Sequence, residues 1–429
     1  MLQDQFAPNW TLTPTSGLQI NTTAISANGA QLITGTSSEY GESSDFAIYS
    51  YATDGSAPSL QWSDPLGDNV TQGVFWVTVS GNGAYAAAGG QYGSGNGFLR
   101  TYNVGVGVSS RQEFSADSRI NEVESSYDGS TIIAVEGANA LLLTLNGQSY
   151  SDSQTNVSES YLRSCGICNT GEIVVVGGEL DSYSESVEFA RGRKPAKRAE
   201  VSSTGLVILY ANQSGTLVEY GRFHTATGVL RVVISADGGY FAASTKNGYV
   251  YLFATPDSPV SGLTPLWSYT PSDQSLGLTY ALAIANVSGQ VYVGAGGNYD
   301  GSGATKAASD SPGFGFAYML KNAGDSGEYY PQRLWINQLE YCPNPGMNMD
   351  ANAQYVTSAD GEPIFSDSNS SPQEETPGNF YLFNAQTGEL YWKYATSLMN
   401  WPMSINAEGT AVFAGSDDGS VYYWGSPAL

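Results

Sequence analysis

The side chains that could form a reactive centre are few, and the cysteines come first. The chain has three, and two of them, Cys165 and Cys168, form a C-G-I-C pair, while Cys342 stands far away. Such a pair can be a structural pair (buried thiols or a tight disulfide), half of a zinc site or a redox dithiol. The rest of a zinc site is missing, and an apolar strand follows the pair instead of a helix that would lower a thiol pKa. We therefore expect a structural role, with bridging to another group and redox function as the alternatives.

Acid–base and nucleophilic catalysis have little to draw on. His224 is the only histidine, it lies in a predicted connection after an outer strand, and no G-x-S-x-G motif is present. A serine or cysteine triad needs a base of this kind. Glycoside hydrolysis needs only two carboxylates, and the chain has 40 acidic residues. We predict no catalytic residue, and keep a carbohydrate-active enzyme as the alternative.

One segment has the residue spacing of a cation-binding loop. Asn298, Asp300 and Ser302 follow the i, i+2, i+4 pattern of the first half of a calcium loop. The distal glutamate of such a loop is missing. We predict no metal site and no cofactor, and these three residues are the one candidate for a cation.

A short basic cluster interrupts a strongly acidic chain. The sequence has 40 acidic against 16 basic residues, a net charge of −24, yet only 13% of residues are charged. This charge disfavours nucleic acid and anionic membranes as partners. Five of the bases fall within eight residues, at Arg191, Arg193, Lys194, Lys197 and Arg198. The cluster is either a solvated loop or a contact for an acidic surface, such as another copy of the chain, and head-to-tail contact of that kind produces filaments.

The composition favours a protein outside the cell. No stretch approaches 18 consecutive apolar residues, and the first residues have neither a basic nor an apolar region, so the chain is either cytoplasmic or a mature form without its leader. We expect the second, partly because the number of Asn-x-Ser/Thr sequons exceeds chance. These glycosylation candidates are Asn9, Asn21, Asn69, Asn156, Asn212, Asn286 and Asn369.

A repeat organises the whole chain. Each unit has a short apolar strand, a tight turn ending in glycine, a second apolar strand, and a third strand rich in aromatic residues, as in WVTVSGNGAYAAAGG followed by GFLRTYNV. A glycine after Asn, Asp or Glu between alternating apolar runs is a strong hairpin signal. The turn positions are Gly29, Gly83, Gly129, Gly171, Gly238, Gly289, Ala353 and Gly409. A fourth, outer strand, which often carries a tryptophan, completes the unit. Four strands per unit at this spacing predict an all-β fold, a single β-propeller of about eight four-stranded blades spanning residues 1–429.

Tryptophans mark the outer strands and indicate how the ring closes. We assign packing between blades to Trp10, Trp62, Trp267, Trp335 and Trp392. The eighth unit ends after its third strand, and the N-terminal segment NWTLTP, about residues 9–14, carries Trp10 at the matching distance before Gly29. We therefore predict that the N-terminal strand completes the last blade and removes a free sheet edge.

The units resemble the WD-repeat and quinoprotein-like (pyrroloquinoline-quinone-type) propeller superfamilies. The segment NAQTGELYWKYA, residues 384–395, matches the quinoprotein-like blade pattern A-x-T-G-x-x-x-W. The resemblance implies the architecture and carries no function with it. A quinoprotein enzyme would use adjacent cysteines or a C-x-x-C-H haem motif; here Asn169 follows Cys168.

Long insertions at about 179–204, 296–315 and 361–378 depart from the plain repeat. They join second to third strands, so they emerge on one face, and loops on a rigid scaffold are where function concentrates. We predict a non-catalytic extracellular binding or assembly module, a cell-surface or filament and sheath glycoprotein, with a protein partner or self-assembly and with a glycan as a further ligand. The alternatives are a carbohydrate-active or quinoprotein-like enzyme and a soluble glycan- or protein-binding propeller.

Overall fold

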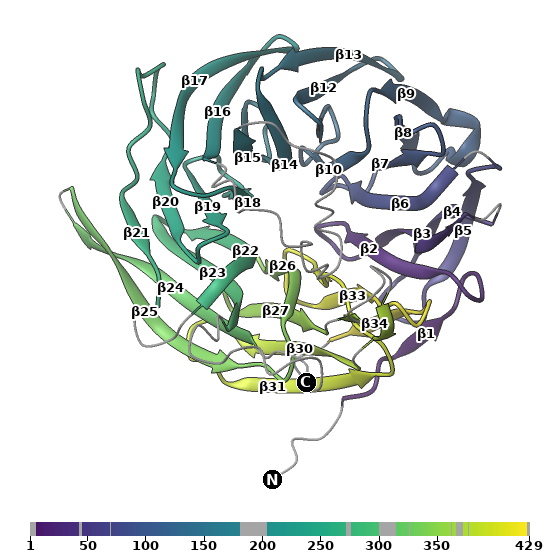
Figure 1. Cartoon of the computed structure of the whole chain (residues 1–429). Helices are drawn as coiled ribbons and strands as arrows, with labels where there is room; N and C mark the ends of the chain where they lie inside the picture. The colour runs from purple at the N-terminus through teal and green to yellow at the C-terminus, as the bar shows by residue number, and fades with distance from the viewer. Residues whose placement is uncertain are drawn as a thin grey trace.

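The chain folds into a β-propeller whose antiparallel sheets are arranged around a central axis (Figure 1). The structure is a computed structural model. It describes residues 6–42, 45–68, 70–180, 204–271, 276–299, 315–325, 327–361, 363–365, 372–375 and 377–426. Its one helical element in these ranges is a short 3-10 turn, η1, at Gly107–Ser110. No described helix has the length and apolar character needed to cross a membrane.

The described strands form eight four-stranded units, which we call blades 1 to 8 in chain order. Six are separate sheets, and blades 1 and 2 join through pairing of β3 with β6. Blade 1 consists of β2 (Gln19–Ile25), β3 (Gln31–Glu42), β4 (Ala47–Ala52) and β5 (Ser59–Pro65). Blade 2 consists of β6 (Val70–Val79), β7 (Tyr85–Tyr92), β8 (Gly97–Asn103) and β9 (Gln112–Ala116).

Blades 3 to 6 are meanders in which the first strand is innermost and the fourth is outermost (Figure 1). Blade 3 has β10 (Ile120–Ser125), β11 (Thr131–Glu136), β12 (Asn139–Asn146) and β13 (Ser149–Asn156). Blade 4 has β14 (Ser160–Ile167), β15 (Ile173–Leu180), β16 (Gly205–Gln213) and β17 (Thr216–Thr225). Blade 5 has β18 (Val229–Ile234), β19 (Tyr240–Thr245), β20 (Val250–Ala254) and β21 (Trp267–Tyr269). Blade 6 has β22 (Leu276–Val287), β23 (Gln290–Tyr299), β24 (Gly315–Asp325) and β25 (Glu328–Gln338).

The last two blades contain the third insertion and the chain end. Blade 7 has β26 (Pro343–Met349), β27 (Tyr355–Asp360), β30 (Gly378–Asn384) and β31 (Leu390–Thr396). Its insertion carries a two-stranded sheet of β28 (Pro363–Phe365) and β29 (Pro372–Glu375). Blade 8 has β32 (Ser404–Ile405), β33 (Ala411–Gly415), β34 (Val421–Gly425) and β1 (Trp10–Leu12). The N-terminal strand thus completes the last blade as predicted, with Trp10 opposite Tyr423.

The turn between the first two strands shows why the repeat folds locally. In blade 2, Gly83 has a φ of +74°, a left-handed conformation that glycine adopts without steric cost. The hydroxyl of Ser80 donates to Asn82 Oδ1 at 2.8 Å and accepts the backbone N–H of Tyr85 at 2.9 Å. Side-chain bonds of this kind hold the hairpin in register.

The five tryptophans of the repeat pattern each contact the following blade. The indole N–H donates to a neighbour's acceptor in three cases: Trp62 to Val104 O at 3.0 Å, Trp267 to Asn322 Oδ1 at 2.9 Å and Trp335 to Ala385 O at 2.8 Å. Trp392 of blade 7 stacks on Trp424 of blade 8, with ring centroids 4.9 Å apart. Trp10, in blade 8, meets Tyr51 of blade 1 edge-on at 5.5 Å. The first and last blades are therefore in contact.

The core consists of apolar clusters between neighbouring blades. One cluster joins Leu142 of blade 3 to Val176 and Ile208 of blade 4, and another joins Ile20 and Leu32 of blade 1 to Phe413 of blade 8. Each blade therefore buries its faces against its neighbours, which leaves the innermost strands around the axis to form the site described next.

Candidate functional site in the central channel

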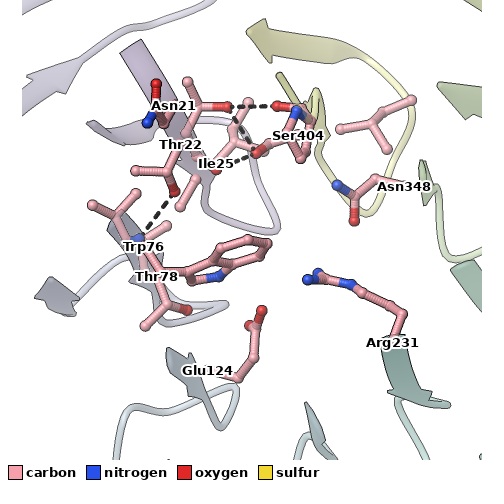
Figure 2. Close-up of a pocket in the computed structure, with 15 residues that line it drawn as sticks. Asn21, Thr22, Ile25, Trp76, Thr78, Glu124, Arg231, Asn348 and Ser404 are labelled. Carbon is pink, nitrogen blue, oxygen red and sulfur yellow. Dashed lines mark hydrogen bonds between the residues drawn. The ribbon is translucent and has the colours of Figure 1, made fainter. Parts of the chain in front are cut away.

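A polar pocket of about 160 Å³ lies where the innermost strands converge (Figure 2). Its walls come from five blades, on β2, β6, β10, β18 and β32, together with Asn348 of β26. Trp76, Glu124, Arg231 and Asn348 point toward one shared space in Figure 2. The pocket brings together two ionisable side chains, Glu124 and Arg231, and we take it with its immediate surroundings as the candidate site.

Glu122, which is 1% exposed, lines an adjoining pocket that shares Glu124, Arg231 and Asn348 with the first, and we call the two pockets together the channel. Its Oε1 lies 3.0 Å from Arg231 Nη2 of blade 5, and its Oε2 accepts the backbone N–H of Cys165 in blade 4 at 3.2 Å. Burial raises the pKa of Glu122, while Arg231 and hydrogen bonds from Ser164 and Cys165 act in the opposite direction. One carboxylate thus connects three consecutive blades.

Glu124 lies two residues further along β10, half-buried, with a different environment. Burial raises its pKa to about 8, and the neighbouring Glu122 charge adds to that rise. Arg231 and hydrogen bonds from Trp76 and Thr78 oppose it. The carboxyl group of Glu124 is therefore largely protonated at neutral pH and can donate a hydrogen bond or a proton.

The guanidinium of Arg231 is fixed on two sides. Besides Glu122, it lies over the ring of Trp76 with its Cζ 4.5 Å from the ring centroid. Its side chain is 13% exposed, and its Nε has no hydrogen-bond partner among the described residues. A buried arginine destabilises the folded state unless a carboxylate compensates its charge, and Glu122 is that carboxylate here.

A second ionic cluster ties blades 4 and 5. Glu179 of β15 accepts from Arg163 Nε at 2.5 Å and from Lys246 Nζ at 2.6 Å. The carboxylate is buried, and burial lowers the pKa of Lys246 while its contact with Glu179 opposes that change. Like the Glu122–Arg231 pair, this cluster crosses a blade boundary.

Uncharged side chains perform the same linking role elsewhere around the channel. Thr22 Oγ1 of blade 1 accepts the N–H of Val77 in blade 2 at 3.0 Å, and Ser164 Oγ of blade 4 accepts that of Val232 in blade 5 at 3.0 Å. The innermost strand has an unpaired edge, and a buried N–H without a partner is costly. Glu122 occupies the matching position in blade 3, so its link to Cys165 is one instance of a general device.

A simple spacing in the sequence identifies channel residues, none of which is among the site residues predicted from sequence motifs. Seven residues before the turn glycine stand Thr22, Trp76, Glu122, Ser164 and Arg231, and two residues later come Ala24, Thr78, Glu124, Gly166 and Val233. Two glutamates and an arginine at these positions are unusual for strands that are otherwise small or apolar. The 40 acidic residues could have been sorted by this register.

The cysteines lie where a structural role places them. All three are buried cysteines outside any disulfide. Cys165 packs in the apolar cluster between blades 3 and 4, where burial and then the charges of Glu122 and Glu124 raise its thiol pKa well above the ordinary value. Cys168 is in the turn, and its Sγ accepts the N–H of Ile173 at 3.3 Å. A thiolate nucleophile is therefore disfavoured at Cys165.

Of the other predicted chemical residues, the structure describes His224 and Asn298, and neither lines the channel. His224 is exposed on the outer strand β17, not in a connection after it. Asn298 is at the end of β23, and Asp300 and Ser302 lie outside the described residues. Within the described part of the chain, no group of three or more His, Cys, Asp or Glu side chains is placed to hold a metal ion. The basic cluster of residues 191–198 also lies outside the described residues.

The sequons differ in accessibility. Asn9 and Asn156 are exposed, and Asn212 and Asn286 are half-buried. Asn21 needs a correction, because it is 7% exposed on the innermost strand β2 and lines the channel pocket, which leaves no room for a glycan. Asn69 and Asn369 lie outside the described residues.

Comparison with known proteins gives no relative from which a function could be transferred. No protein-family model matches the chain, and no curated protein has a similar sequence. The function has to be argued from the residues themselves.

Proposed function

We propose that this β-propeller is a non-catalytic binding or assembly module of the cell surface or the extracellular space. The observation that carries the proposal is that buried ionic groups link blades to one another. Three carboxylates, each at most 6% exposed, pair with a base that lies across a blade boundary. They are Glu122, Glu179 and Asp64. A scaffold tied in this way is rigid, and rigid scaffolds present loops and grooves for binding.

The charge of the protein surface supports the same proposal. Arg100 and Arg111 both pair with Asp64, and Arg163 and Lys246 both pair with Glu179. Pairing buries the Arg100 and Arg163 side chains, which are 6% and 9% exposed, in a chain with only 16 bases against 40 acidic residues, and this favours an acidic surface rich in neutral polar groups. Such a surface avoids nucleic acid and suits protein or glycan contacts.

We also propose that, among β-propellers, the repeats belong with the quinoprotein-like type. Gly388 of the A-x-T-G motif has a φ of +74°, and a Cβ there would lie 2.5 Å from Trp335 Cγ. The glycine of the motif therefore makes room for the tryptophan of the preceding blade, which is a packing reason for the pattern.

The test is the state of the natively purified protein under negative-stain electron microscopy. Ordered filaments or lattices would favour the structural-subunit version and make the basic residues 191–198 the first to reverse in charge. Separate ring-shaped particles would favour the ligand-binding version. Turnover of a substrate by the purified chain would contradict both versions.

A second candidate, a carbohydrate-active enzyme, is favoured by the Glu122–Glu124 pair. One carboxyl group is held against an arginine and the other has a pKa of about 8, and glycoside hydrolysis uses two carboxyl groups of which one is protonated. An activity screen on oligosaccharides tests it, because Glu124→Gln should abolish any hydrolysis that uses this acid.

A further inference from the structure

A second depression, which we call the blade 1–2 groove, lies between the first two blades. It has a volume of about 600 Å³, and its lining includes Asn28, Gln31, Gln61, Trp62, Asn82 and Val106. These residues come from the β2–β3 and β6–β7 turns, from β3 and β5, and from the loop after β8. By the strand order, this face is opposite the face where the second strand of each blade leads into the third.

The groove is neutral in an otherwise acidic molecule. None of the residues that line it is charged, and five carry side-chain amides: Asn28, Gln31, Gln61, Asn82 and Asn103. Apolar surface lies among the amides, and Val106 at the rim is 58% exposed. Sites for small ligands combine apolar walls with a few placed polar groups in volumes of about 300–1,000 Å³.

One wall of the groove is a half-buried indole held in a fixed orientation. The Nε1–H of Trp62 donates to Val104 O, and its ring lies 4.9 Å from that of Tyr102, centroid to centroid. Gly107 approaches closely, since a Cβ there would lie 3.1 Å from Trp62 Cδ1. A ring fixed before a ligand arrives loses little entropy on binding.

An acceptor in the groove lacks a donor. Gln31 Oε1 is buried and has no hydrogen-bond partner among the described residues. By contrast, Asn28 Oδ1 and Asn82 Oδ1 each accept from a serine hydroxyl and a backbone N–H within their turns. Buried polar atoms are normally satisfied, and Oε1 is out of reach of solvent, so a ligand hydroxyl donates to it only when the Gln31 side chain turns toward the groove.

We propose that the blade 1–2 groove binds a neutral oligosaccharide, an inference that rests on the proposed role as a binding module and names its ligand class. A sugar hydroxyl can donate to Gln31 Oε1, and the C–H face of a pyranose ring suits the apolar surface around Trp62. The groove offers no charged partner for an ionic ligand. The net charge of −24 further disfavours acidic sugars.

The test titrates the full chain with maltohexaose, cellohexaose, mannohexaose and chitohexaose by calorimetry and tryptophan fluorescence. Gly105→Trp blocks the groove, because Gly105 lines it, its backbone is outside the left-handed region, and a Cβ there meets nothing closer than 3.7 Å. The matched control is Gly262→Trp, an equally open glycine in the loop before β21. Gln31→Met removes the orphaned acceptor while keeping the side-chain length.

We expect at least one of these sugars to bind the native chain and the control alike. Gly105→Trp should weaken binding at least about tenfold, and Gln31→Met about three- to tenfold, the range of one hydrogen bond. The proposal is overturned if none of the four sugars binds at about 1 mM. Equal binding by Gly105→Trp would also overturn it, because the sugar would then occupy another place.

Self-association, measured on the same variants by light scattering, separates this result from the proposed function. Gly105→Trp should leave assembly unchanged. If it abolishes assembly and no sugar binds, the groove holds a second copy of the chain, and the glycan assignment is wrong. If sugars bind the groove and the chain also turns over a substrate, the non-catalytic proposal fails while the groove assignment stands.

Discussion

The central channel and the blade 1–2 groove are both lined by several strands or turns, yet they use opposite chemistry. The channel contains Glu122, Glu124 and Arg231, and the ion pair is held to neighbouring blades. The groove is lined by amides, small residues and one indole. In this protein the buried charges serve cohesion between blades, whereas the neutral depression keeps an unsatisfied acceptor for a ligand.

Electrostatics explains why the channel holds blades together and the groove is suited to bind a neutral ligand. A buried ion pair strongly penalises the loss of one partner, so it fixes neighbouring elements relative to each other. It is a poor site for capturing neutral ligands, because both carboxylate oxygens of Glu122 are already engaged, one by Arg231 and the other by the backbone N–H of Cys165. Neutral amides cost less to desolvate and leave directional donors and acceptors available.

The largest expected effect comes from removing the arginine of the channel. Arg231→Met leaves the 1%-exposed Glu122 without its counter-charge, which should lower the free energy of unfolding by about 3–5 kcal/mol at pH 8. The loss should shrink at pH 5, where an unpaired carboxylate can take up a proton. Urea denaturation at the two pH values measures both.

Its control is Arg222→Met, which breaks the exposed Arg222–Glu219 pair on the outer strand β17. Exposed pairs contribute only about 0–1 kcal/mol. Equal losses in the two variants would show that the channel charges are not ties between blades, and the contrast with the groove would disappear.

The next effect is the pH dependence that Glu124 gives to folding. Its pKa is about 8 in the folded chain against an ordinary value of 4.5, so between these values the folded state holds a proton that the unfolded state has released. The stabilisation that comes from protonated Glu124 is fully present below about pH 4.5 and is lost as the pH rises to about 8. Glu124→Gln removes this component, so its advantage over the native chain should grow with pH, by at most about 1.4 kcal/mol per unit.

Asp128→Asn is the matched control for that series. Although burial acts to raise it, the pKa of Asp128 is lowered below 3.8 by hydrogen bonds from Ser130 and Ser126. Its contribution to stability is therefore lost only in acid, and the difference between this variant and the native chain should stay constant from pH 5 to 8. A constant difference for Glu124→Gln as well would refute the protonated carboxyl group in the channel.

Features that recur from unit to unit could be predicted from the sequence, whereas contacts between distant units could not. Turn glycines such as Gly83 and outer-strand tryptophans such as Trp62 recur in successive units, so the blades and the pairing of β1 with β34 could be predicted. The Glu122–Arg231 pair joins blades 3 and 5, which are not consecutive, and no local pattern reports such a contact. The groove likewise needs the β5 strand of one blade and a loop of the next.

The smallest effect tests whether Cys168 is only a substitute for serine. Four other blades have a serine at its position in the turn, Ser26, Ser80, Ser126 and Ser235, whose hydroxyl accepts a backbone N–H at 2.9–3.1 Å. Cys168→Ser should therefore change the free energy of unfolding by less than about 1 kcal/mol, since a normal hydrogen bond replaces the 3.3 Å contact with sulfur.

Cys165→Ser gives the contrasting case within the same C-G-I-C pair. Its Sγ lies 3.7 Å from the carbonyl oxygens of Glu122 and Ile133 in an apolar cluster, so a hydroxyl there should cost about 1–3 kcal/mol. Labelling with a thiol reagent at pH 8 should spare Cys165 until denaturant is added, because burial keeps its pKa high. Rapid labelling of Cys165 in the native chain, or a large loss of stability in Cys168→Ser, would mean that the pair has a role beyond packing and turn formation. The division between cohesive channel and binding groove would then need a third, reactive region beside the channel.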